Sequence, residues 1–199
     1  MSLHALVEGV EEAERAVRAG ATVLRLAAKP GTTVVCSGRG LRWFGTTFYV
    51  LDDVEAAREL GADGVHLDRH PERRELARSA GLLVGTSIAG YDAALAAGAD
   101  YLEVVCSPEQ AADRGAYRVW LDELERIGAA VRVPLIASGA LDAANVAACI
   151  AAGAAGVAIE GAPLDRTLRR AIDEALARRA VASSNGAEST PAGERTVSS

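Results

Sequence analysis

Short apolar runs recur along the chain, and many of them end in residues that could bind an ion or a phosphate. If these runs are parallel strands of one closed barrel, their carboxyl ends share one face, where barrels built in this way carry their active sites. The last residues of each run are therefore the first to consider for chemistry. They include Lys29, Asp52, Asp68, Ser87, Ser138, Gly139 and Gly161.

Lys29 is the only lysine among the 21 basic residues of the chain. Lysine carries a compact ammonium group and does not replace arginine freely at a binding site. A single lysine at the end of a strand therefore favours a catalytic or phosphate-binding role. The alternative is an ordinary surface lysine.

Asp52 and Asp68 end two consecutive runs. Their carboxylates could therefore lie within reach of one Mg²⁺, which takes one or two carboxylates together with waters and substrate phosphate. The alternative for an aspartate after a strand is to cap the following helix, and we expect this of Asp53. For His66, we expect a hydrogen-bonded histidine of the barrel rather than a catalytic one.

Small residues follow the last two runs. In such barrels the backbone N–H groups of these turns bind phosphate, although short glycine turns also occur without any ligand. The candidates for binding substrate phosphate here are Ser138, Gly139, Ala140, Gly161 and Ala162.

Strand alternation places Arg25 and Lys29 on one face of their run, and Glu103 and Glu160 on faces of theirs. If these faces line the lumen, Arg25, Glu103 and Glu160 are ionisable groups inside a small barrel, where an unpaired charge is very costly. We therefore expect them to pair. The pairs would form either a structural layer or the polar floor of a pocket.

The elements that position these residues follow from an internal repeat. An Ala-rich segment with helical spacing, a glycine turn and an apolar run recur at Gly20, Gly61, Gly98 and Gly153. The glycine fits the residue after a helix, and the run fits a buried parallel strand. Repeated units of this kind predict an α/β fold, a (βα)8 TIM barrel. We expect strands at residues 3–8, 23–28, 47–51, 64–67, 82–86, 101–105, 134–137 and 157–159.

The helices are expected between these strands, at residues 10–19, 54–60, 71–80, 91–97, 119–131, 142–152 and 164–179. Residues 31–46 show no amphipathic pattern, so the helix after the second strand is expected to be reduced. The barrel wall left uncovered there would be covered by the loop itself or by a second subunit in a homo-oligomer. We expect one domain, residues 1–181, followed by a disordered polar tail, residues 182–199.

The composition narrows the choice of partners. A net charge of −6 disfavours a nucleic-acid backbone or an anionic membrane as the main partner, and leaves a small phosphorylated substrate as the expected one. The three cysteines show no metal-ligand spacing, which indicates reduced thiols. No basic leader and no run of roughly 18 apolar residues is present, so we expect a soluble, cytoplasmic protein.

Residues 62–67, ADGVHL, resemble a motif of the thiamine phosphate synthase/TenI superfamily. Weaker matches follow in register: residues 24–29 are similar to VQLREK, 50–52 to IND, 85–87 to GxS, 136–140 to xxIGG and 156–161 to GVAVVS. The resemblance implies sites for an aminopyrimidine diphosphate, Mg²⁺ and a thiazole phosphate, and a reaction that joins the two rings with loss of pyrophosphate.

Carried over residue by residue, the motifs match at Lys29, Asp52, Ser87 and Gly139. Arg25 stands at the position of the family's glutamine, and Glu103 at that of a glycine. The resemblance implies a synthase-like enzyme, intact or degenerate, in which Lys29 and Gly139 hold phosphate, Asp52 holds Mg²⁺ and Ser87 hydrogen-bonds the substrate. The alternatives are a Schiff-base lyase that uses Lys29 and a non-catalytic TenI-like protein that binds a phosphorylated ligand.

Overall fold

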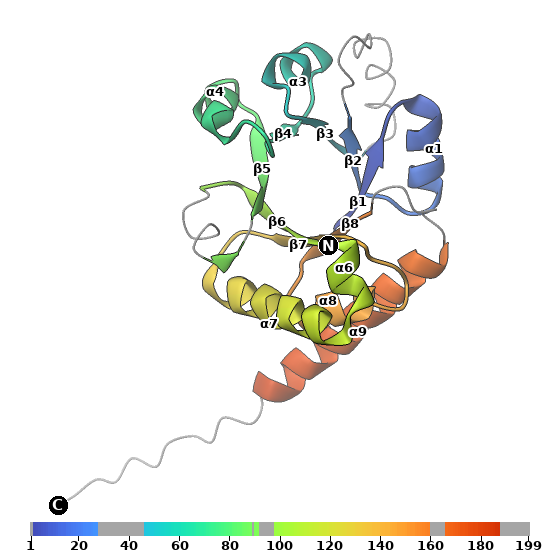
Figure 1. Ribbon diagram of the computed structural model, residues 1–199. Helices are drawn as coiled ribbons and strands as arrows, with labels where there is room; N and C mark the ends of the chain where they lie inside the picture. Colours follow the sequence, from blue (N-terminus) through green and yellow to red (C-terminus); the bar gives the residue numbers. More distant parts are fainter. Residues whose placement is uncertain (1, 28–45, 89, 92–97, 160–165, 188–199) are drawn as a thin grey trace, which may run out of the picture.

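The computed structural model describes residues 2–27, 46–88, 90–91, 98–159 and 166–187. Its centre is a closed barrel of eight parallel strands, in which each strand pairs with its neighbours in chain order (Figure 1). The expected (βα)8 barrel is therefore confirmed. The strands are β1 (Ser2–Val7), β2 (Val23–Leu26), β3 (Thr47–Leu51), β4 (Gly64–His66), β5 (Leu83–Ile88), β6 (Tyr101–Cys106), β7 (Leu135–Gly139) and β8 (Gly156–Ile159).

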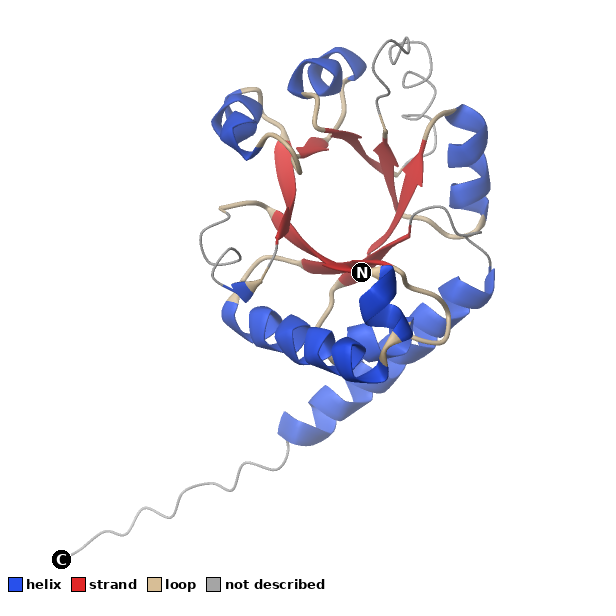
Figure 2. Ribbon diagram, in the orientation of Figure 1, coloured by secondary structure: helices blue, strands red, loops and turns tan. Residues whose placement is uncertain are grey.

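The helices surround this barrel on the outside (Figure 2). A short 3₁₀ turn, η2 (Pro71–Arg73), precedes α4, and α9 packs against α8. The helices are α1 (Val10–Arg18), α3 (Val54–Leu60), α4 (Arg74–Ser79), α6 (Pro108–Ala112), α7 (Arg114–Ala130), α8 (Val146–Ala151) and α9 (Arg166–Ala187).

Helix α3 shows how the repeat sets the ends of its elements. The Asp53 carboxylate accepts a hydrogen bond from Ala56 N at 2.9 Å, which confirms the expected N-cap. Gly61 ends the helix in the left-handed region, with φ of 61°, where a residue with a Cβ is disfavoured. The chain then turns directly into β4, so the helix and the next strand stay close to the barrel wall.

Two apolar clusters hold the fold together. The larger one lies between the outward faces of the strands and the helices, and it includes Leu24, Val50 and Val65. The smaller one consists of residues on the other face of the strands. Because strand residues alternate between the two faces, this smaller cluster lies inside the barrel. Its members are Val23, Tyr49, Tyr101, Ile136 and Ala158.

Two glycines make room for the tyrosines of the inner cluster. A Cβ added to Gly64 would lie 2.3 Å from Cε1 of Tyr49, and one added to Gly85 would lie 2.0 Å from Cζ of Tyr101. Both distances are far below van der Waals contact. The glycine of the ADGVHL segment is therefore required by packing inside the barrel.

The structure differs from the sequence-based expectation between β6 and residue 119, where no helix is expected. Two helices, α6 and α7, occupy that stretch instead. Ser107 and Gln110 form a reciprocal capping box at the start of α6, and Asp113 caps α7 by accepting from Ala116 N at 2.7 Å. The sequence signal was present in Ser107-Pro108-Glu109-Gln110 and was missed.

Other boundaries also differ from the expectation. Helix α9 continues to Ala187, so residues 182–187, assigned to the tail, are helical. Helix α8 starts at Val146 instead of 142, because Asp142 Oδ1 accepts from Ala144 N and Asn145 N and closes a turn before it. The expected reduced helix at 31–46 lies outside the described residues except for its last one, as do residues 92–97 and the tail from residue 188. Within the part of the chain that is described, none of the helices has the length and apolar character needed to cross a membrane.

We expect Gly64→Ala to lower the free energy of unfolding by about 1–3 kcal/mol, because the new methyl group overpacks the lumen. The control is Gly128→Ala in α7, where an added Cβ meets nothing closer than 3.6 Å. That change should raise stability by about 1 kcal/mol through helix propensity. Urea denaturation of both variants measures this, and equal effects would contradict the packing account.

Candidate active site

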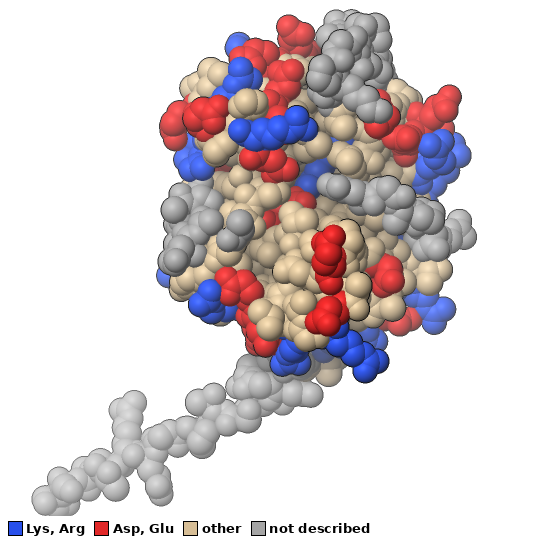
Figure 3. All heavy atoms as spheres, viewed as in Figure 1, with Lys and Arg blue, Asp and Glu red and all other residues tan. Residues whose placement is uncertain are grey.

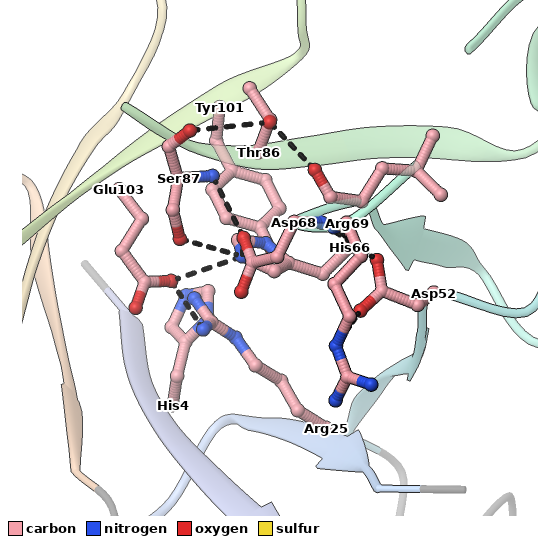
Figure 4. Close-up of polar contacts among 11 residues, drawn as sticks. His4, Arg25, Asp52, His66, Asp68, Arg69, Thr86, Ser87, Tyr101 and Glu103 are labelled. Carbon is pink, nitrogen blue, oxygen red and sulfur yellow. Dashed lines mark hydrogen bonds and ion pairs between the residues drawn. The ribbon is translucent and has the colours of Figure 1, made fainter. Parts of the chain in front are cut away.

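A buried ion pair crosses the inside of the barrel. Arg25 comes from β2 and Glu103 from β6, which lie four positions apart in the closed order of eight strands and so on opposite walls. Arg25 Nη1 donates to Glu103 Oε2, and each residue is only 3% exposed (Figure 4). The expected pairing is confirmed for these two residues, whereas Glu160 lies outside the described residues. We call this pair the lumen bridge.

His4 holds the arginine of the lumen bridge from the wall of β1. Arg25 Nε donates to His4 Nδ1 at 3.1 Å, so the hydrogen of the imidazole is on Nε2, which donates to Ser2 Oγ at 2.8 Å. Burial, and then the positive charge of Arg25, lower the pKa of His4 well below its ordinary value. His4 is therefore a neutral acceptor that fixes the direction of the guanidinium.

His66 contacts the glutamate of the lumen bridge from β4. Its Nε2 lies 2.9 Å from Asp68 Oδ1, 3.2 Å from Ser87 Oγ and 3.5 Å from Glu103 Oε2. Its Nδ1 lies 2.7 Å from the Tyr101 hydroxyl. Because two carboxylates face Nε2 and a carboxylate only accepts, that nitrogen carries a hydrogen.

This tautomer decides the role of Ser87. Ser87 Oγ accepts from His66 and does not lose its proton to it, so His66 does not act as a base for a serine nucleophile. The Ser87 hydroxyl keeps its own hydrogen, which can be donated to the Asp68 carboxylate or to a ligand. The expectation that His66 is a hydrogen-bonded histidine of the barrel is confirmed.

Asp68 is held as a carboxylate at the carboxyl end of β4. Its Oδ1 also accepts from Ser87 N at 3.1 Å. Burial raises the pKa of this carboxyl, but the hydrogen bond and charge of His66 and the hydrogen bonds from Ser87 outweigh burial. The pKa of Asp68 therefore lies well below its usual range. Its negative charge is maintained beside the hydroxyl of Ser87.

Asp52 orders the loop that carries Asp68. Its Oδ1 accepts from Asp68 N at 2.8 Å and from Arg69 N at 2.9 Å. Asp52 is also the only described residue other than glycine with a positive φ, 54°, a conformation that costs free energy and occurs often at functional sites. The ends of β3, β4 and β5 are thus tied together through Asp52, Asp68 and Ser87.

The two aspartates retain capacity for a cation. Asp52 Oδ2 has only the Nε of the exposed Arg69 nearby, at 3.5 Å, and Oδ2 of Asp68 has no hydrogen bond with any described residue. Among the described residues there is no group of three or more His, Cys, Asp or Glu that could hold a metal. Mg²⁺ needs only one or two carboxylates when a phosphate and waters complete its shell, so the two side chains fit that ion.

The turn after β7 carries the small residues expected to bind phosphate, but some of their polar groups already make hydrogen bonds within the protein. Gly139 has φ of 91°, and a Cβ there would lie 2.1 Å from Cys106 O. The N–H of Ala140 already donates to Cys106 O at 3.0 Å. Ser138 is 1% exposed, and its Oγ has no hydrogen-bond partner among the described residues. The remaining candidates, Lys29, Gly161 and Ala162, lie outside the described residues.

Sequence reasoning missed two members of this site, His4 and Tyr101. Tyr101 lies two positions before Glu103 on β6, so strand alternation alone places it on the same inner face. His4 lacked such a signal, because its role depends on the distance across the sheet to Arg25. In the space-filling view, acidic and basic side chains surround a hollow at the centre of this face (Figure 3).

Comparison with known proteins gives a consistent answer. The model of a protein family described as thiamine monophosphate synthase matches residues 4–162. A thiamine-phosphate synthase of Methanoculleus marisnigri is 39% identical over 163 residues, which cover 74% of this chain and 76% of the relative. A thiamine-phosphate synthase of Geobacillus kaustophilus is 35% identical over 146 residues, covering 68% and 66%.

Solved structures agree with these sequence matches. The thiamine phosphate pyrophosphorylase of Pyrococcus furiosus superposes with a TM-score of 0.74 at 26% identity, covering 88% of this chain and 96% of that one. A structure titled native KDPGal superposes with a TM-score of 0.66 at 19% identity, covering 92% and 97%. The second likeness shows the barrel fold alone.

Glu103→Gln tests the lumen bridge. Because the change leaves the buried Arg25 without a counter-charge, we expect the free energy of unfolding to fall by about 3–5 kcal/mol. The control is Asp122→Asn, which removes an exposed ion pair with Arg118 and should cost no more than about 0.5 kcal/mol. Chemical denaturation measures both, and a Glu103→Gln protein as stable as the control would contradict the buried pair.

Asp68→Asn tests the depressed pKa of Asp68. A carboxyl whose pKa is lower in the folded state stabilises the fold above its unfolded pKa, about 3.9, and this contribution is lost as the pH falls through the folded pKa. The variant should therefore be less stable than the unchanged protein at pH 7, and the gap should narrow at pH 3. Urea denaturation at both pH values provides the test. A constant gap would mean that the charge of Asp68 is not coupled to folding.

Proposed function

Because the chain belongs to the thiamine monophosphate synthase family, we propose that it joins an aminopyrimidine diphosphate to a thiazole phosphate and releases pyrophosphate. The observation that carries this proposal is the hydrogen-bonded group of Asp52, Asp68 and Ser87 at the carboxyl ends of three adjacent strands. Barrels of this type bind and transform their substrates at that end. The family match, residues 4–162, covers all three.

The proposed reaction breaks the bond between the pyrimidine's methylene carbon and the diphosphate oxygen. The bonding electron pair leaves with pyrophosphate, and the thiazole forms a new bond to the same carbon. Fixed donors aimed at the departing charge are the main contribution that a protein makes to such a step. In this proposal the Ser87 hydroxyl donates to the substrate, and Lys29, Ser138 and the turns at Gly139 and at Gly161 with Ala162 bind phosphate groups. The N–H of Ala140 is left out of this role, because it already donates to Cys106 O.

Magnesium is part of the same proposal. Asp52 and Asp68 would hold it through their Oδ2 atoms, of which that of Asp52 has only the exposed Arg69 as a partner. The bound ion would neutralise negative charge on the leaving pyrophosphate. A cytoplasmic location and a homo-oligomer remain predictions from the sequence.

A second candidate is a non-catalytic relative that binds a phosphorylated ligand. The observation in its favour is the lumen bridge, which places a glutamate side chain where the resembling family has a glycine. No described contact bears on the Schiff-base alternative, because Lys29 lies outside the described residues. Borohydride trapping of an adduct on Lys29 would identify that third class.

The direct test of the proposed function is pyrophosphate release from the aminopyrimidine diphosphate in the presence of the thiazole phosphate. We expect release that depends on both substrates and on Mg²⁺. Complementation of a thiamine auxotroph that lacks the synthase should succeed as well. Tight binding of thiazole phosphate without pyrophosphate release would contradict the enzyme and favour the non-catalytic relative.

Ser87→Ala tests the proposed role of the hydroxyl in the same assay. We expect kcat/KM to fall by roughly 10²-fold, as happens when a positioned donor to developing negative charge is removed. The matched control is Ser79→Ala on α4, whose hydroxyl donates only to Leu76 O on the surface. Equal activity of the two variants would remove Ser87 from the mechanism.

A further inference from the structure

The lumen bridge lies directly on the carboxyl side of two apolar residues that point into the barrel. Two residues before Arg25 on β2 is Val23, and two before Glu103 on β6 is Tyr101. Both belong to the inner apolar cluster and lie on the amino side of the bridge. A ligand that enters from the carboxyl ends therefore meets the bridge as a floor.

The floor leaves one buried donor unused. Arg25 Nη1 donates to Glu103 and Nε to His4, but Nη2 has no hydrogen-bond partner within the described parts of the chain. Arg25 is only 3% exposed. Buried donors in folded proteins are nearly always paired, so this atom is a position where a ligand acceptor would be bound.

The charges around the floor indicate that the ligand group accepting from Arg25 Nη2 is neutral. The guanidinium and the carboxylate of the lumen bridge cancel each other, and the carboxyl group of Asp68 lies beyond them at the carboxyl end of β4. An anionic group would gain little at this depth, whereas a neutral ring with an unprotonated nitrogen offers the acceptor at no cost in charge repulsion. The negative groups of the ligand therefore belong at the mouth, where the proposed cation and phosphate turns lie.

We propose that the lumen bridge determines which rings the site accepts, because it limits how deeply a ring can enter. This inference rests on the proposed function. A pyrimidine held at the mouth by a diphosphate arm presents the carbon opposite that arm to the floor. The two ring nitrogens flank this carbon, so one of them can accept from Arg25 Nη2. The site then selects rings that carry only a small substituent on that carbon.

Three proteins and four probes test this inference. The first protein is the unchanged chain. The second, the glycine variant, carries Arg25→Gln together with Glu103→Gly and so opens the floor. The third, the double glutamine variant, carries Arg25→Gln together with Glu103→Gln and keeps side chains across the lumen. Changing both partners avoids an orphaned buried charge. The probes are inorganic pyrophosphate and the diphosphates of 4-amino-5-hydroxymethylpyrimidine with hydrogen, methyl or ethyl on the carbon opposite the arm. Calorimetric titration gives each Kd.

For the unchanged chain and the double glutamine variant, we expect affinity to fall at least about tenfold from the methyl probe to the ethyl probe, a range typical of one added methylene in a closed pocket. In the glycine variant the same pair should differ by no more than about threefold. Pyrophosphate, which reaches only the mouth, should bind all three proteins alike. If the glycine variant does not fold, Arg25→Gln/Glu103→Ala takes its place.

The outcomes separate the two proposals. One outcome is that all three proteins bind pyrophosphate and that the substituent on the ring changes the Kd equally in the glycine variant and the double glutamine variant. This outcome would overturn the role of the lumen bridge and leave the proposed function standing. Failure of the unchanged chain to bind pyrophosphate or any pyrimidine probe, with and without Mg²⁺, would overturn the proposed function and the inference that rests on it.

Discussion

A buried charge must find a partner, and in this barrel that constraint organises the whole polar interior. Arg25 and Glu103 project from opposite walls and satisfy each other across the lumen. Their remaining groups then dictate the neighbours: the arginine needs a neutral acceptor, which His4 supplies, and the glutamate faces the N–H of His66. Replacing one partner would therefore disturb the fold and the site together.

The same polar network extends from the buried floor to the mouth. His66 links the lumen bridge to Asp68 and Ser87, and Asp52 fixes the loop of Asp68 through two backbone N–H groups. The result at the mouth is an Asp68 carboxylate held in its charged form beside the Ser87 hydroxyl. The apolar half of the lumen, packed around Tyr49 and Tyr101, gives this network a rigid base.

The sequence predicted those features that depend on local or periodic signals. The recurring Gly turns predicted the barrel. The position of Asp53 between a strand and a helix predicted that it caps α3. Strand alternation placed Arg25 and Glu103 inside the barrel, where they were expected to pair. The contact between His4 and Arg25 could not be predicted, because it depends on register across two strands. Helix α6 was missed although its capping box was visible, since a five-residue helix has no periodicity of its own. The end of α9 was placed too early because composition alone marks where apolar residues stop, not where a helix stops.

The central claim is that a neutral His4 accepts from the arginine of a buried bridge. The ¹⁵N chemical shifts of the His4 imidazole test it most directly, and the chain has only three histidines to assign. We expect His4 to be the neutral tautomer with hydrogen on Nε2 and to stay neutral when the pH is lowered to about 5, below the ordinary histidine pKa. A His4 that carries its hydrogen on Nδ1, or that becomes protonated near its ordinary pKa, would contradict it, because Arg25 could then not donate to that nitrogen.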